Sequence, residues 1–482
     1  FIKVILKTIP GWCYVISRLI LDHVTVHYYL PNWRKIFMNS QVEDKRPSDD
    51  QQGTAAAKAG SAAFQAQYLL RDTAAGLITG AMAIPLTIGI AIMSDYPIKI
   101  GLATVAFASL VGWINAWFKP GNFIGSPGIA AGLAPVLALG VASFGWQNMA
   151  FCIFMTAVMQ AVIWKFNWQR YLLVAVPVYL VEGLLAGVGL KILLKFSEFT
   201  YEIPAEAVTD EFWNSARMQM VAISAGGLGV FLMLFSKFKD TQPAIPYFAL
   251  IIGGVVLAQF VSVPMISVEN IDLHLKLPLP EADVSTMMMV YMLLFCAMLA
   301  IVDVIEQVMS NAAIEKIDPL KRKTNSNNSL LAIWIANMGS SFFHGMTNLD
   351  GLAKSTTNKL AGAMTKFSVL IIGAVVCFFT FNPQYLDFLP KFALAAIMMF
   401  TGYKMIAGLA HVTHYGPYAL MLALLTGGLV YKVGIFEGLL IAMVLHGLIH
   451  FMVYTKHDNL PGKLVIKRYF DNLKKDSSSN LQ

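Results

Sequence analysis

Charged residues are scarce in this chain of 482 residues. Asp, Glu, Lys and Arg make up only 13% of it, about half the share usual in soluble globular proteins. Hydrophobic residues make up 57%. Apolar runs of roughly 18 to 25 residues recur from about residue 71 onward, and that length crosses a hydrocarbon core of about 30 Å. The composition excludes an ordinary soluble domain and predicts an all-α polytopic membrane protein.

Chemical motifs are also missing. The cysteines Cys13, Cys152, Cys296 and Cys377 are scattered without a CxxC pair, and the histidines show no HExxH spacing. The sequence has no Walker motif, no GxSxG and no GxGxxG after a strand, which argues against an ATP-driven pump and against an enzyme. We therefore predict no cofactor, no certain metal site and no nucleic-acid partner.

Lysine and arginine positions predict the orientation of the chain. They gather in alternate loops, while the intervening loops are acidic. This pattern predicts a multi-pass protein of the cell (inner or plasma) membrane with both termini in the cytoplasm. Residues 1–69 are predicted to be an interfacial extension and linker, 70–455 the transmembrane domain and 456–482 a short cytoplasmic tail. About fourteen apolar segments are predicted to start near residues 71, 99, 124, 147, 170, 218, 243, 286, 328, 348, 366, 387, 411 and 433.

Two short segments, the third and the tenth, are interrupted by glycine. They contain GSPGIAAGLAP, which begins at Gly125, and HGMTNLDGLAK, whose Gly345 follows about 220 residues later. An offset of seven segments predicts two inverted repeats, in which paired broken helices mark the binding site of a secondary transporter. Small residues that permit close helix packing are the alternative interpretation.

Helix starts at the membrane midplane would suit an anion, because their free N–H groups and dipoles present positive charge. Lys354 would lie in the first turn of the second half-helix, where a cation opposes the dipole, and so is a functional candidate. An internal ion pair with Asp350, four residues earlier, is the alternative. The predicted substrate-binding residues are Gly125, Ser126, Pro127, Gly128, Ile129, Gly351, Leu352, Ala353, Lys354 and Ser355.

Carboxylates inside the eighth segment are candidates for coupling. Asp303 and Glu306 lie three residues apart on one helix face, and Ser310 follows on that face. Carboxylates within a membrane are rare and usually functional. They could take up a proton or, with hydroxyl and carbonyl oxygens, hold Na⁺ near Glu306 and Ser310, whereas a structural hydrogen bond between helices is the alternative. We count Asp350 with them as a coupling-ion candidate.

These segments together resemble the SulP family of inorganic anion transporters across about residues 70–455. RDTAAGLITGAMAIPLTIGIAI is similar to the opening stretch of that family, PVYLVEGLLAGVGL to its fifth helix and GLAKSTTNKLAGAMTK to its tenth. The resemblance implies a fourteen-helix inverted-repeat fold in which a core domain rocks against a gate domain, and a homodimer. It places the acidic residue of helix eight at Glu306, the following hydroxyl at Ser310 and the basic residue of helix ten at Lys354.

The chain also departs from the family pattern. Lys354 stands where arginine is common, Ala353 where some members have serine, Gly128 where some cation-coupled members have threonine, and Asp350 where a small residue is usual. Only about 26 residues follow the last predicted segment, so we expect no cytoplasmic STAS domain.

The predicted function is secondary active transport of a small inorganic anion such as sulfate or bicarbonate. We expect coupling to H⁺ or Na⁺ and alternating access, with the anion between half-helices three and ten. A nucleobase–proton symporter of the same architecture and an anion channel are the alternatives, and a membrane scaffold without transport is a third.

Overall fold

The computed structural model describes residues 61–457 except 130, 170–176, 202–214, 243, 262, 270 and 282–283. Most of the predicted N-terminal extension and nearly all of the predicted tail lie outside the described residues. Our predictions for those two regions are therefore not tested by the structure.

Helices dominate the described residues, and each predicted apolar segment coincides with a helix. They are α3 (Leu69–Met93), α4 (Ile98–Phe118), α5 (Ala134–Phe144), α6 (Trp146–Lys165), α8 (Val178–Tyr201), α9 (Ser215–Phe238), α10 (Ile245–Leu257), α11 (Thr286–Ile317), α12 (Ser326–Ser341), α13 (Leu352–Leu360), α14 (Phe367–Phe381), α15 (Lys391–Ala407), α16 (Leu409–Val412), α17 (Pro417–Lys432) and α18 (Ile435–His457). Among the described residues, five helices are long and apolar enough to cross a membrane. The number of crossings stays a prediction.

Two strands interrupt this helical fold. β1 (Pro127–Ile129) pairs antiparallel with β2 (Asn348–Asp350), so that Pro127 lies opposite Asp350 and Gly128 opposite Leu349. Every residue of both strands is buried. The two strands form backbone hydrogen bonds with each other. These bonds satisfy the polar backbone groups of the extended chain where no water is present. The pair is a local exception within a fold built of helices, so the predicted all-α class is confirmed.

The start of the first half-helix also differs from the prediction. The sequence predicts a half-helix that starts within GSPGIAAGLAP, but Pro127 lies in β1, and α5 begins only at Ala134. The glycines and proline of GSPGI favour extended chain over helix, and the partner strand supplies the hydrogen bonds. The second half-helix agrees better, because Gly351 caps α13 and Lys354 lies in its first turn.

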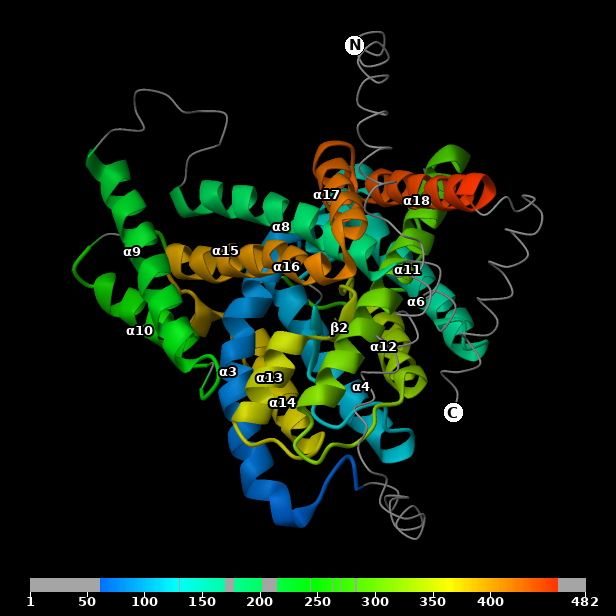
Figure 1. Ribbon diagram of the computed structural model, residues 1–482. Helices are drawn as coiled ribbons and strands as arrows, with labels where there is room; N and C mark the ends of the chain where they lie inside the picture. The colour runs from blue at the N-terminus through cyan, green and yellow to red at the C-terminus, as the bar shows by residue number, and fades with distance from the viewer. Residues whose placement is uncertain are drawn as a thin grey trace. The chain divides into compact units, whose positions relative to one another are not determined.

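The helices around the strand pair form two sets. α3, α4 and α14 pack against one another, α13 packs on α3, and α6 packs on α11 and α12. α8 packs against α15 and α17. Figure 1 shows α13 and α14 beside α3, with β2 between these helices and α12.

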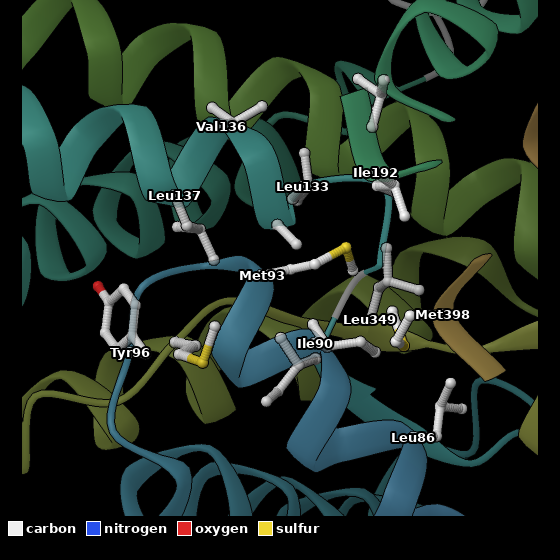
Figure 2. Close-up of a cluster of buried hydrophobic side chains, with 14 of the residues drawn as sticks. Leu86, Ile90, Met93, Tyr96, Leu133, Val136, Leu137, Ile192, Leu349 and Met398 are labelled. Atoms are coloured by element: carbon white, nitrogen blue, oxygen red, sulfur yellow. The ribbon is translucent and has the colours of Figure 1, made fainter. Parts of the chain in front are cut away.

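A buried apolar cluster lies where the two sets meet. Figure 2 shows side chains from α3, from the start of α5 and from β2 together with side chains of α8 and α15. The labelled members from those elements are Leu86, Ile90, Met93, Leu133, Val136, Leu137, Leu349, Ile192 and Met398. Ile129 of β1 and Leu349 of β2 belong to this cluster, so hydrocarbon borders the strand pair and helps to exclude water from it.

Candidate functional site

The first turn of α13 is held against the segment that precedes β1. Gly351 N donates a hydrogen bond of 3.0 Å to Ser126 O. Ser126 N donates in turn to Ser355 Oγ, also at 3.0 Å. The Ser126 hydroxyl is buried and has no hydrogen-bond partner among the described residues. The structure thus brings the two predicted halves of the site together, with an unpartnered, buried hydroxyl at their contact.

Lys354 lies across β1. Its side chain is only 3% exposed, and Nζ donates a hydrogen bond of 2.9 Å to Pro127 O. A Cβ atom added at Gly128 would overlap the ammonium group, so the glycine makes the space in which the ammonium lies. The predicted position of Lys354 at the start of α13, next to the Gly125–Ile129 segment, is confirmed, whereas its role stays a prediction.

Substituting Gly128 tests this packing. We expect Gly128→Ala to displace the Lys354 ammonium, because Nζ is the flexible end of a side chain and yields before the backbone does. Moving a positioned group by about 1 Å can lower the rate of a protein's reaction by on the order of 100-fold. We therefore expect the KM for the anion to rise by roughly 10- to 100-fold. Initial rates of uptake into proteoliposomes measure this.

Gly226→Ala, in α9, is the matched control, because nothing lies within 4 Å of a Cβ added there. We expect the control to transport like the wild-type chain. An unchanged KM in the Gly128→Ala variant would show that the position of the ammonium does not matter for the anion.

Asp350 is the most heavily bonded acid of the site. Its Oδ2 accepts hydrogen bonds from Asn122 Nδ2 at 2.7 Å and from Gln307 Nε2 at 2.9 Å. Its backbone N–H donates to Gln307 Oε1, and its carbonyl accepts from Ser310 Oγ at 2.6 Å. These bonds fix the end of β2 to α11 and to the loop after α4.

The ion pair of Asp350 differs from the sequence-based alternative. The i, i+4 spacing suggested Lys354 as its partner, but Asp350 Oδ1 lies 3.8 Å from Lys366 Nζ, and the Lys354 ammonium bonds to Pro127 O. Lys366 stands at the edge of an apolar run, where the sequence alone indicates a loop cation. The structure places it directly before α14, and its side chain is only 4% exposed.

The acids of α11 have separate surroundings. Asp303 Oδ2 accepts from Gln160 Nε2 at 2.6 Å and from Asn337 Nδ2 at 3.2 Å, and Asn337 Oδ1 accepts from Asn348 N at 2.7 Å. Asp303 therefore belongs to a network that joins α6, α11, α12 and β2. These contacts support the structural alternative for Asp303.

Glu306 faces the turn before α5. A Cβ added at Gly132 would overlap its carboxylate. Its Oε1 is buried and has no hydrogen-bond partner among the described residues. An uncompensated carboxylate oxygen in such a place is costly unless it is protonated or binds a cation. Oδ1 of Asp303 is also buried without a partner among the described residues, but two amides hold Oδ2 of Asp303, so Glu306 fits the predicted coupling role better. In the part of the chain that the structure describes, no cluster of three or more His, Cys, Asp or Glu side chains could hold a metal ion.

Asp72 of α3 holds the loop that leads to Lys366. Its carboxylate accepts from Met364 N at 2.6 Å, from Thr365 N at 3.1 Å and from Thr365 Oγ1 at 2.5 Å. Asp72→Ala leaves these donors unpaired, and we expect it to lower the free energy of unfolding by about 2 to 4 kcal/mol. Denaturation of the purified protein in detergent measures this.

The control for Asp72 is Asp240→Ala, since Asp240 is exposed. Its stability is expected to stay within about 0.5 kcal/mol of the wild-type value. Equal stability of both variants would show that the Asp72 bonds contribute nothing.

Apolar helices that surround two buried, paired strands define a membrane protein of the multi-pass class. The model of the sulfate permease family matches residues 69–426, and this chain belongs to that family. The family is one of transporters, which confirms the prediction that the chain is not an enzyme.

Known relatives agree with this assignment. The Bacillus subtilis protein YvdB, provisionally named a sulfate transporter, is 25% identical over 367 residues, and the match covers 71% of this chain and 66% of YvdB. The chain thus spans about two thirds of the length of that relative.

Solved structures show the fold. The transmembrane domain of the cyanobacterial bicarbonate transporter BicA matches with a TM-score of 0.64 at 17% identity, over 79% of this chain and 98% of that domain. The murine anion transporter Slc26a9 in the inward-facing state matches with a TM-score of 0.65 at 15% identity, over 86% of this chain and 74% of that protein.

Proposed function

We propose that the chain is a secondary active transporter of a small inorganic anion, sulfate or bicarbonate, across the cytoplasmic membrane. The observation that carries the proposal is the buried Lys354 ammonium, held against Gly128 at the start of α13. A buried ammonium without an ion-pair partner is costly unless an opposite charge joins it, and a small anion would supply that charge.

The anion would lie beside the strand pair. Lys354 would attract it, and the unpartnered Ser126 hydroxyl and the first N–H groups of α13 would donate to it. Both groups come from segments that the predicted inverted repeats place in equivalent positions, and the antiparallel pairing of β1 with β2 supports such an inversion.

Alternating access would come from movement between the two helix sets. In our proposal the set that carries the site (α3 to α6 and α11 to α14) moves against the set that contains α8 and α15. The apolar cluster of Figure 2 would be the contact that forms and separates. We further propose a homodimer with both termini in the cytoplasm.

Coupling would run through Glu306. A proton or Na⁺ taken up at its unpartnered Oε1 would offset the charge of the incoming anion, so that the occupied site is less costly to carry through the membrane. Ser310 and the carbonyl of Asp350, which are already bonded to each other, supply further oxygens on the same side. The name of YvdB favours sulfate and that of BicA favours bicarbonate.

Uptake into proteoliposomes tests the proposal. Labelled sulfate, bicarbonate and fumarate are offered under an imposed pH or Na⁺ gradient, with empty liposomes as the control. We expect saturable, gradient-dependent uptake of at least one inorganic anion. Competition by uracil without competition by any anion would identify a nucleobase symporter, and currents far above carrier turnover would identify a channel. Either result would overturn the proposal.

A further inference from the structure

Lys366 joins the two crossing segments of the site. It is the residue before α14, and its buried Nζ donates a hydrogen bond of 2.5 Å to Gly125 O, two residues before β1. The same Nζ lies 3.8 Å from Asp350 Oδ1, at the end of β2. One ammonium group therefore bonds to the entry of the first strand and pairs with the exit of the second.

Asp350 needs a counter-charge because its carboxylate is buried. It directly precedes Gly351, the N-cap of α13, so its carboxylate lies at the helix end that attracts anions. An uncompensated negative charge there would offset the positive charge of Lys354 and compete with a bound anion. Asn122 and Gln307 donate hydrogen bonds to it but carry no charge, and the ion pair with Lys366 supplies the compensation.

A small cavity between α4 and α12 borders this ion pair. Asp350 and Lys366 line the cavity together with Asn115, Asn122 and Ser329, whereas Lys354 does not. Lys354 instead bonds to Pro127 O and lies against Gly128. The two buried lysines thus have separate places, one in an internal ion pair and the other free of any carboxylate within ion-pair distance among the described residues.

We propose that Lys366 is a positioning residue that sets the valence of the transported anion by neutralising Asp350. With Asp350 compensated, the charge beside the substrate is that of Lys354, and the site can accept a divalent anion. Without Lys366, the carboxylate would repel a divalent anion about twice as strongly as a monovalent one. This inference rests on the proposed anion transport. It identifies the Asp350–Lys366 ion pair as the feature that determines which anions are accepted.

Two single variants with opposite predictions test the inference. Near neutral pH, sulfate is divalent and bicarbonate is monovalent, so the ratio of their affinities reports the charge of the site. We expect Lys366→Gln to lower the sulfate-to-bicarbonate affinity ratio by about tenfold and Asp350→Asn to raise it by about tenfold. The double variant Asp350→Asn/Lys366→Gln should return the ratio to within about threefold of wild type, because it removes both charges.

Two quantities are measured for each variant. They are the KM for the anion that is transported and the inhibition constant of the other anion when it competes for uptake. A merely structural role of the pair would change both constants alike in all three variants and leave the ratio unmoved, and that result would overturn the inference. Lys316→Gln, at an exposed lysine of α11, controls for the loss of a positive charge elsewhere.

Folding of the variants is checked by size-exclusion chromatography and thermal unfolding in detergent. If Lys366→Gln does not fold, the other two variants still test the inference. It requires a raised sulfate-to-bicarbonate affinity ratio in Asp350→Asn and a wild-type ratio in the double variant. A wild-type chain that moves no anion would refute the proposed function itself. A wild-type chain that transports while Asp350→Asn leaves the ratio unmoved would refute this inference alone.

Discussion

Replacing Lys354 by Met is expected to reduce anion uptake by roughly 30- to 3000-fold while the protein stays folded. Losing one partner of a buried, hydrogen-bonded charge pair typically costs about 2 to 5 kcal/mol of binding, and each 1.4 kcal/mol is about tenfold. Stability should be unchanged or higher, because the methionine fills the same space without a buried charge. Uptake rates and thermal unfolding of the same preparation measure both effects.

Lys359→Met is the matched control, since Lys359 lies in the last turn of the same helix. Its uptake is expected to match that of wild type. If Lys354→Met transports normally while folded, the ammonium does not bind the anion, and the site must lie elsewhere.

Glu306→Gln is expected to uncouple transport from the imposed gradient. Oε1 of Glu306 is buried without a hydrogen-bond partner among the described residues, and the amide keeps the shape of the side chain but cannot carry a charge. We expect accumulation driven by the pH or Na⁺ gradient to fall by at least about tenfold, whereas exchange of internal for external anion continues. Paired measurements of net uptake and of exchange separate the two activities.

Glu315→Gln serves as the control on the same helix. The Glu315 carboxylate accepts hydrogen bonds from the backbone N–H and the hydroxyl of Thr324 at 2.8 Å, and it is not part of the candidate site. Its gradient dependence should be that of wild type. Full gradient-driven accumulation by Glu306→Gln would exclude Glu306 as the coupling residue.

The sequence predicted Lys354 and Glu306 through a simple physical signal. Both are charged residues in apolar surroundings, and Lys354 also opposes the dipole of its own helix. A charged residue in an apolar or electrostatically unfavourable position can be recognised from the sequence alone. The structure places Lys354 at the predicted helix start, against Gly128, and places Glu306 against Gly132, while the roles of both stay predictions.

The strands β1 and β2 could not be predicted in the same way. Each contains only three residues, too few for an alternating pattern, and each is extended because of a partner more than 200 residues away in the chain. The glycines and proline of GSPGI predict a break in a helix, and the structure has one there. They could not show whether the break is a helix start or a strand.

The pairing of Asp350 with Lys366 was missed for a related reason. Local rules favour partners three or four residues apart, which pointed to Lys354. Lys366 follows the whole of α13 and reaches Asp350 only because the chain turns back after that helix. Its place at the edge of an apolar run also fitted a loop cation, and nothing local distinguished the two interpretations.

Chemical rescue of Lys354 is the most direct test of the proposed anion site. Lys354→Cys is made in a chain whose Cys13, Cys152, Cys296 and Cys377 are replaced by alanine, and it is treated with an aminoethyl or a methyl methanethiosulfonate. The first reagent restores an ammonium group, and the second adds a neutral group. We predict that the aminoethyl reagent alone restores labelled anion uptake and that the transported anion slows the modification. Equal uptake after both reagents, with no protection by the anion, would contradict the account.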